Sequence, residues 1–333
     1  MPSRYVPSWI ACATDNPVER ETRPFCTDYT ARANASAPGC FVSSFLHLRR
    51  TTRVIAVLLA VFVLAGATYQ GVATALERHR FERPGGLVDA GGHQLHIHCT
   101  GKGSPIVILE AAAGSMSAAW AWVQPEVARI TRVCSYDRAG LGWSEAGDGR
   151  YLPARVPEEL RVLLDRANEI GPIVLVGHEA GALFARMYAA QFSSNTAALV
   201  LIDDPTIEPT PSGPTFVSAW PWLARIGVLR VSNRLRTLAT GLPGEAGGAM
   251  GAFLNRPDHL ARAALELSQL PELEAEARSA SLPPNIAVTT ISVGTHEQPA
   301  MLVARENAAQ VTQAIAATIT RVREHGTEAA SVR

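Results

Sequence analysis

The feature that most constrains this chain is a glycine-flanked segment between an apolar run and a helical one. Residues 177–181 (GHEAG) follow the apolar residues 173–176 and precede the helix-like residues 182–188. This order predicts a strand, a sharp turn and a helix, with the middle side chain of the turn exposed above a parallel sheet. Glycine flanks the turn because a Cβ would not fit there. The exposed residue is Glu179.

Strand-like and helix-like segments alternate after residue 86, which predicts an α/β fold with a mostly parallel sheet and helices on both faces. Gly91-Gly92 predicts a hairpin turn between residues 87–90 and 93–99. The further predicted strands are 106–110, 132–136, 173–176, 198–203 and 286–293, and the predicted helices are 117–130, 157–170, 182–188 and 300–324. Residues 205–285 interrupt the alternation with helical stretches at 220–238 and 259–270, which predicts an inserted helical cap.

The N-terminal part of the chain differs in composition from the rest. Residues 1–48 are rich in Pro, Thr, Ser and Arg, which predicts a disordered leader. Residues 54–67 contain no polar side chain, and no charge follows before Glu77, so 49–80 is expected to be a transmembrane anchor or signal segment. Arg49, Arg50 and Arg53 favour the cytoplasm on the N-terminal side, which places the following domain outside. A cleaved signal peptide, giving a secreted protein, and a buried core helix stay open.

The charge composition of the chain argues against nucleic acid as a binding partner. The 333 residues are 47% hydrophobic and carry a formal net charge of zero. No cluster of Lys and Arg is interleaved with aromatic residues, so nucleic acid is not expected as a partner. The length and apolar content predict one sizeable domain with additional segments. No cofactor or metal site is expected.

Three segments in the right order resemble the α/β-hydrolase superfamily, in particular its membrane-tethered bacterial branch. Residues 88–96 (VDAGGHQLH) resemble its opening hairpin, residues 136–144 (YDRAGLGWS) resemble its D-x-R-G-x-G-x-S loop, and residues 177–181 resemble its nucleophile elbow. The resemblance implies an α/β-hydrolase domain at 81–333, with its helical cap at about 205–285. It also implies a small apolar ligand or ester as the partner.

The resemblance also implies positions for the catalytic groups. The elbow normally holds serine, and here Glu179 stands in that place. The oxyanion hole would use the backbone N–H of Ala180 and that of Ala111 or Ala112. Glu110 precedes this loop, and its carboxylate would oppose a developing oxyanion if it pointed inward. His296 is the candidate base, although it follows what looks like strand seven instead of strand eight. Asp203 and Glu297 are the candidate acids.

Two branches of the superfamily use a carboxylate nucleophile, and this chain carries the signature of neither. Haloalkane dehalogenases have Trp directly after the nucleophile, where this chain has Ala180, and epoxide hydrolases have cap tyrosines, whereas 205–285 contain no tyrosine. Three hypotheses remain. The protein hydrolyses small apolar esters with Glu179 as an unusual nucleophile, or it is catalytically inactive and binds a small apolar ligand or a partner, or it is a tethered domain with a purely structural role. Trp220 and Trp222 in the predicted cap are the expected fluorescent reporters of binding.

The resemblance further implies a pairing of two cysteines. In this fold strand two runs antiparallel beside strand four, so Cys99 and Cys134 would approach within bonding range. Export would favour a disulfide between them. Two small buried thiols are the alternative.

Overall fold

The computed structural model describes residues 39–147, 151–207, 217–293 and 301–331. The chain divides into two compact units, Met1–Ile55 and Ala56–Arg333. Helix α1 occupies Gly39–Arg80, so the described part of the first unit is the beginning of this helix. Residues 39–48, expected to be part of a disordered leader, are therefore helical. The reason is cooperativity, because each residue added to an existing helix gains a hydrogen bond without a new nucleation cost.

Helix α1 is long and apolar enough to cross a membrane. Its segment 48–80 contains 33 residues with a mean hydropathy of 2.0, and only 6% of its most apolar window is buried in the protein. Large apolar side chains along it, among them Leu58, Phe62 and Leu64, are exposed. An exposed apolar surface of this extent marks a site of interaction with a membrane or with another protein.

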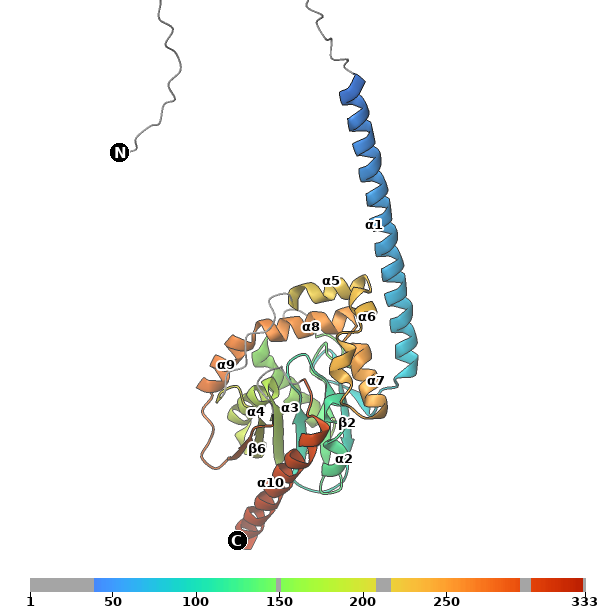
Figure 1. The fold of residues 1–333 in the computed structure, drawn as a ribbon. Helices are drawn as coiled ribbons and strands as arrows, with labels where there is room; N and C mark the ends of the chain where they lie inside the picture. Colours follow the sequence, from blue (N-terminus) through green and yellow to red (C-terminus); the bar gives the residue numbers. More distant parts are fainter. Residues whose placement is uncertain (1–38, 148–150, 208–216, 294–300, 332–333) are drawn as a thin grey trace, which may run out of the picture. The chain divides into compact units, whose positions relative to one another are not determined.

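The second unit is built around a seven-stranded sheet in the order β1-β2-β4-β3-β5-β6-β7 (Figure 1). Only the pairs β1–β2 and β2–β4 are antiparallel. The strands are Gly86–Asp89, Gln94–Thr100, Ile106–Glu110, Val133–Tyr136, Ile173–His178, Thr196–Ile202 and Ala287–Ile291. Each predicted strand is present within a few residues of its expected bounds. In the described residues between β7 and the last helix, 292–293 and 301–304, no eighth strand occurs.

Helices cover both faces of the sheet. Successive residues of a strand point to opposite faces, and in the central strands both sets are apolar and need to be covered. Ile108 and Leu175 point to the face covered by α3 (Val156–Arg166) and α4 (Ala180–Gln191). Their neighbours Val107 and Val174 point to the face covered by α2 (Gln124–Val127) and α10 (Arg305–Ser331). The helix expected at 117–130 is instead a 3-10 turn, Ser117–Trp120, followed by the short α2.

The cap lies between β6 and β7, as expected. Its helices are α5 (Trp220–Arg225), α6 (Val228–Ser232), α7 (Gly244–Phe253), α8 (Pro257–Ser268) and α9 (Leu270–Ser279). The helix expected at 220–238 is interrupted because Gly227 and Asn233 adopt left-handed conformations, with φ of 73° and 54°. Glycine and asparagine tolerate this region best, and both residues end helical turns here.

Cys99 and Cys134 are directly opposite each other on the antiparallel strands β2 and β4, and a disulfide joins them. The bond closes a loop with a sequence separation of 35 residues. In the chain-entropy model a loop of this length stabilises the folded state by about 4 kcal/mol.

We therefore predict that a reductant lowers the free energy of unfolding by about 4 kcal/mol. The measurement is denaturant unfolding with and without dithiothreitol. A variant with both Cys99→Ala and Cys134→Ala is the control and should not respond to the reductant. Equal midpoints for the wild type in both conditions, together with two free thiols by mass analysis, would contradict the prediction.

Candidate active site

The turn between β5 and α4 has the strained geometry of a nucleophile elbow. Glu179 has φ 49° and ψ −116°, an unfavourable conformation for a residue with a side chain. Its N–H donates to the carbonyl of Ile202 at 2.9 Å, which ties the turn to the end of β6. A Cβ on Gly177 would overlap the start of α4, and a Cβ on Gly181 would overlap the carbonyl of Glu110. Both positions thus require glycine, because neighbouring backbone occupies the space that a Cβ would need.

We predict that Gly181→Ala destabilises the fold by about 3 kcal/mol, because the new methyl group meets backbone that cannot rotate away. The matched control is Gly86→Ala, since no atom lies within 4 Å of a Cβ built there. Unfolding midpoints of both variants against the wild type provide the measurement. Equal unfolding midpoints for the two variants would show that the backbone around the elbow shifts to accommodate the methyl group without a loss of stability.

The loop after β3 lies beside the elbow, where an oxyanion hole would form. The carbonyls of Ala111 and Ala112 accept hydrogen bonds from Arg138 at 2.7 and 2.8 Å. Because C=O and N–H of one trans peptide point in opposite directions, the bond to the Ala111 carbonyl turns the N–H of Ala112 away from Arg138. Within the described residues, no acceptor of the chain binds the N–H of Ala112 or Ala180. These two donors are available to a ligand.

The Arg138 side chain uses all five of its N–H groups in this buried region. It binds both carboxylate oxygens of Glu266 at 2.8 Å and one oxygen of Glu110 at 2.6 Å, in addition to the two carbonyls. The hydroxyl of Tyr136 donates to the other oxygen of Glu110. The carboxylate of Glu110 is therefore held by Arg138 and Tyr136, and the concern that it would oppose an oxyanion does not apply.

The pKa values of the two glutamates differ within this network. Burial raises the pKa of Glu110 in spite of the nearby Arg138 guanidinium. Burial acts on Glu266 too, but Arg138 and the N–H of Gly114 together outweigh it and lower the pKa of that carboxyl. Arg138 pairs with both carboxylates, with Glu110 at 2.6 Å and with Glu266 at 2.8 Å, and Glu266 reaches the loop from cap helix α8.

Helix α8 binds the oxyanion loop at both backbone polar groups of one residue, Gly114. Glu266 accepts the N–H of Gly114 at 2.8 Å, and the Nε2 of His259 donates to the Gly114 carbonyl at 3.0 Å. The Nδ1 of His259 accepts the N–H of Gly142 at 3.1 Å. One neutral histidine therefore links the cap to both the oxyanion loop and the D-x-R-G-x-G-x-S loop.

This arrangement predicts a loss of stability in acid. Burial lowers the pKa of His259 below its ordinary value of 6.5. Below pH 6.5 the unfolded chain binds a proton at this ring and the folded chain does not, so the free energy of unfolding falls by up to about 1.4 kcal/mol per pH unit. Denaturant unfolding at pH 7.5 and 5.5 tests this, with His259→Gln as the variant that lacks the titrating ring. Identical pH dependence in both proteins would contradict it.

The structure positions some of the predicted acids and bases near the elbow. Asp203, with φ 49°, accepts the N–H of Val293 at 2.9 Å and the hydroxyl of Ser292 at 3.1 Å. Its second oxygen lies 3.6 Å from the Nε2 of the buried His178, beyond hydrogen-bond distance. Asp203 therefore ties the ends of β6 and β7 together. His296 and Glu297 lie outside the described residues.

The fold and these motifs agree with the comparisons to known proteins. The family model described as the alpha/beta hydrolase fold matches residues 104–232. The crystal structure of an enol-lactonase from Burkholderia xenovorans superposes with a TM-score of 0.51 at 16% identity, covering 72% of this chain and 100% of that one. The chain has the α/β-hydrolase fold.

Curated relatives match this chain over shorter stretches. An uncharacterised vacuolar membrane protein of Saccharomyces cerevisiae is 31% identical over 129 residues, which is 33% of this chain and 20% of the relative. The 2-hydroxy-6-oxo-2,4-heptadienoate hydrolase of Pseudomonas putida is 31% identical over 121 residues, which is 35% of this chain and 44% of the relative. The matches span one third or less of the length of the first curated relatives.

Ser117, His96 and Asp137 lie close together but do not form a catalytic triad. The Nδ1 of the buried His96 lies 2.9 Å from Asp137 and 3.4 Å from the hydroxyl of Ser117, while its Nε2 contacts the carbonyl of Pro84. Burial opposes a charged ring, but Asp137 outweighs it, so the pKa of His96 is raised. The ring gives both protons to oxygen acceptors and keeps no lone pair to activate Ser117.

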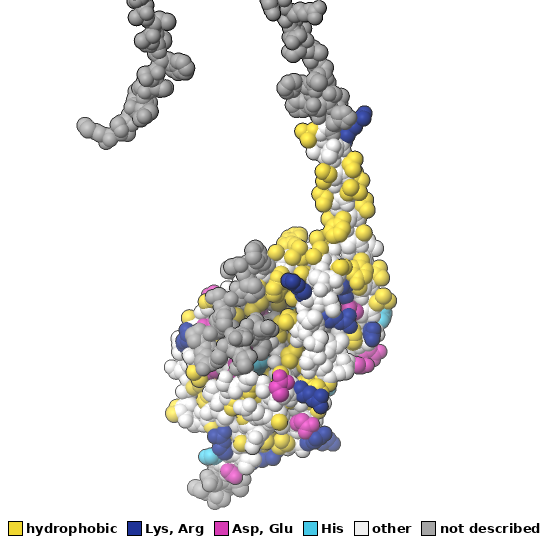
Figure 2. Space-filling view, viewed as in Figure 1, with side chains coloured by type: hydrophobic (Ala, Val, Ile, Leu, Met, Phe, Trp, Pro, Cys, Tyr) yellow, Lys and Arg dark blue, Asp and Glu magenta, His cyan; other side chains and the backbone are white. Residues whose placement is uncertain are grey.

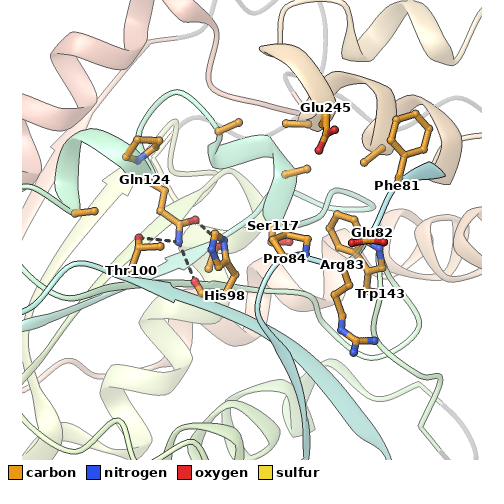
Figure 3. Close-up of a pocket in the computed structure, with 17 residues that line it drawn as sticks. Phe81, Glu82, Arg83, Pro84, His98, Thr100, Ser117, Gln124, Trp143 and Glu245 are labelled. Atoms are coloured by element: carbon orange, nitrogen blue, oxygen red, sulfur yellow. Dashed lines mark hydrogen bonds between the residues drawn. The ribbon is translucent and has the colours of Figure 1, made fainter. Parts of the chain in front are cut away.

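A cavity lies beside the cap, and the elbow residues do not border it. It has a volume of about 570 Å³ and is bordered by cap helix α7, the segment after α1 and strand β2 (Figure 3). Phe81 and Trp143 contribute apolar wall, while His98 and Gln124 are the polar groups near β2. Neither Glu179 nor Ala180 lines it. Trp143 is thus the tryptophan placed to report a ligand, in place of the expected Trp220 and Trp222.

Among the described residues, one group has the composition of a metal site. Cys99, Cys134 and Glu169 have ligand atoms within 4.8 Å of one another. The two sulfurs form the disulfide, and Glu169 receives two hydrogen bonds from Arg132 at 2.5 and 3.2 Å. Thiolates, not disulfide sulfurs, bind metals, so this group does not fit a metal ion.

Proposed function

We propose that this protein is a hydrolase of small apolar esters in which Glu179 activates the attack on the carbonyl carbon. The observation that carries the proposal is the elbow, which keeps Glu179 in a strained conformation beside the N–H of Ala180. Strain of this kind costs about 1–3 kcal/mol and concentrates at functional sites. The P. putida relative, a hydrolase by name, supports hydrolytic chemistry for this chain as well.

Glu179 is better suited to act as a general base than as a nucleophile on an ester. If its carboxylate added to the carbonyl, the tetrahedral intermediate would expel the carboxylate again, because an alkoxide is the poorer leaving group. As a base it accepts a proton from water, the resulting hydroxide adds to the carbonyl carbon, and the proton then passes to the departing alkoxide. The N–H groups of Ala180 and Ala112 would bind the oxyanion, and Asp203, His296 and Glu297 remain proposed as supporting acids and base.

The first test is an assay of the full-length wild type and Glu179→Ala on short- and medium-chain acyl esters. Turnover that disappears in Glu179→Ala supports the proposal. The matched control is Glu158→Ala, which removes an exposed glutamate from α3 and should leave turnover unchanged. No turnover by the folded wild type on any ester would contradict the hydrolase proposal.

A second function is favoured by the position of the cavity. Because the elbow residues do not line the 570 Å³ space, an apolar ligand can bind under the cap without contact to Glu179. In that case the protein is a catalytically inactive binder of a small apolar molecule. Quenching of Trp143 fluorescence by a non-hydrolysable medium-chain ether, lost in Trp143→Phe, supports this function, and unchanged fluorescence would argue against it.

We propose that α1 anchors the domain to a membrane, with the domain on the extracytoplasmic side. The length and exposed apolar surface of α1 support the anchor, and the match to a vacuolar membrane protein is consistent with it. Arg49, Arg50 and Arg53 before the apolar segment support the orientation, as does the disulfide. Protease should digest the domain in cells whose outer membrane is permeabilised but whose cytoplasmic membrane is intact. A cytoplasmic protein in the same cells should stay undigested.

A further inference from the structure

The corner of the cap formed by α5, Gly227 and α6, residues 220–232, packs directly on α1. A Cβ on Gly66 would lie 2.2 Å from the carbonyl oxygen of Ile226, and a Cβ on Gly227 would lie 3.0 Å from the carbonyl oxygen of Gly66. One turn further along α1, the side chain of Gln70 accepts a hydrogen bond from Arg230 at 2.9 Å, and Glu77 pairs with the same arginine. We call residues 220–232 the cap corner.

The contact with Gly66 lies inside the uncharged stretch of α1. This stretch extends over residues 54–76, from the last arginine to Glu77, and its 23 residues correspond to about 35 Å of helix. That length matches the hydrocarbon core of a bilayer, about 30 Å. The 12 residues before Gly66 would span only about 18 Å. For α1 to cross the bilayer, the segment that contacts the cap corner must also lie within the membrane or at its boundary.

The surface of the cap corner has the composition of a membrane interface. Trp222 and Val231 are 69% and 75% exposed, and Arg225 stacks on the ring of Trp222 at 4.7 Å. Figure 2 shows hydrophobic side chains that continue from α1 onto the adjoining part of the domain. Tryptophan is enriched where bilayer and water meet.

The charged side chains of the cap corner and of the four residues that follow it, 233–236, also fit a membrane surface. From Val217 to Gly244 the sequence contains no Asp or Glu, while Arg225, Arg234 and Arg236 are exposed. Arginines near a bilayer surface are attracted to anionic headgroups. Arg230, the fourth arginine, faces α1 and pairs with Glu77, so its charge is compensated close to the membrane.

We infer that the cap corner is a membrane-binding surface, which lies at the boundary between headgroups and acyl chains of an anionic bilayer. This inference rests on the proposed anchor. It places the cap of the hydrolase fold against the lipid, so that an apolar molecule dissolved in the membrane reaches the protein at the cap without crossing bulk water.

The test uses the full chain with Cys12, Cys26 and Cys40 replaced by Ser, reconstituted in vesicles that contain phosphatidylglycerol. A fluorophore is attached at Val231→Cys or, as the matched control, at Ile170→Cys. Ile170 is 76% exposed and lies before β5, at the end of the sheet opposite the elbow. Lipids that carry a quencher high in their acyl chains should remove most of the emission at 231 and leave that at 170 unchanged.

An alkaline wash separates failure of the anchor from failure of this inference. If the protein leaves the vesicles in the wash, both the anchor and the membrane-binding surface are overturned. If the protein stays in the vesicles but the labels at 231 and 170 are quenched equally little, the membrane-binding surface alone is overturned. Quenching at 231 that falls when vesicles lack anionic lipid supports the part assigned to the exposed arginines.

Discussion

Replacement of Arg138 by Met should lower the free energy of unfolding by about 3–5 kcal/mol, because it leaves the Glu266 carboxylate buried without a cation. The substitution also removes the donors to the carbonyls of Ala111 and Ala112, so the oxyanion loop loses its support as well. Denaturant unfolding measures the loss. Arg129→Met is the matched control, since Arg129 pairs with Glu126 on the surface at 74% exposure and should contribute less than about 1 kcal/mol.

The same network predicts different effects for its two glutamates. Glu266 accepts two hydrogen bonds from Arg138 and one from the N–H of Gly114, whereas Glu110 accepts one from Arg138 and one from the Tyr136 hydroxyl. Glu266→Gln should therefore destabilise the fold more than Glu110→Gln. Similar losses of unfolding free energy for both glutamine variants would contradict this ranking. A loss below about 1 kcal/mol in Arg138→Met would show that the network does not hold the loop.

Replacement of Glu179 by Gln should reduce ester turnover by about 10²–10⁴-fold, the contribution typical of a positioned general base. Glutamine keeps the size of the side chain, so the elbow and the N–H of Ala180 stay in place. The measurement is kcat/KM on the best ester of the panel. Retention of most activity in Glu179→Gln would contradict a role for the carboxylate.

Turnover in ¹⁸O-labelled water distinguishes the two roles that Glu179 can have. A general base activates water without bonding to the substrate, so the label should appear in the acid product and not in Glu179. A nucleophilic carboxylate would acquire label itself as the covalent intermediate is hydrolysed. Mass analysis of the peptide that contains Glu179 after many turnovers gives the answer, and label in that peptide would overturn the general-base mechanism.

Much of the sheet and one part of the site could be predicted from the sequence, because the relevant signals are local. The buried strands β3, β5 and β6 are runs of apolar residues, and each is found where it was expected. Gly177 and Gly181 mark the elbow because the backbone there excludes a Cβ, a requirement that any sequence with this turn must meet.

The cap could be predicted as an insertion but not in its details. Helix α7 contains four glycines among ten residues, which gives it a poor helix propensity. Tertiary contacts stabilise this helix, because Gly248 leaves room for the ring of Phe81 and Gly251 leaves room for the side chain of Arg236. The break at Gly227 is likewise explained by its close approach to α1.

The contacts of cap helix α8 with the oxyanion loop could not be predicted from the sequence for a related reason. His259, Ala263 and Glu266 recur at the spacing of one helix face, which is a signal, but nothing local says what that face contacts. Glu266 is separated from Arg138 by 128 residues.

The sequence by itself determined the order of strands and helices, the apolar N-terminal helix and the position of Glu179 at the elbow. These follow from periodicity and backbone sterics within short segments. Only the tertiary structure decided that Arg138 pairs with Glu110 and Glu266, that His259 stays neutral and that the elbow residues do not border the cavity. Those properties depend on burial and on partners distant in the chain, because the charge state of a group is set by the desolvation and the neighbouring charges it meets after folding.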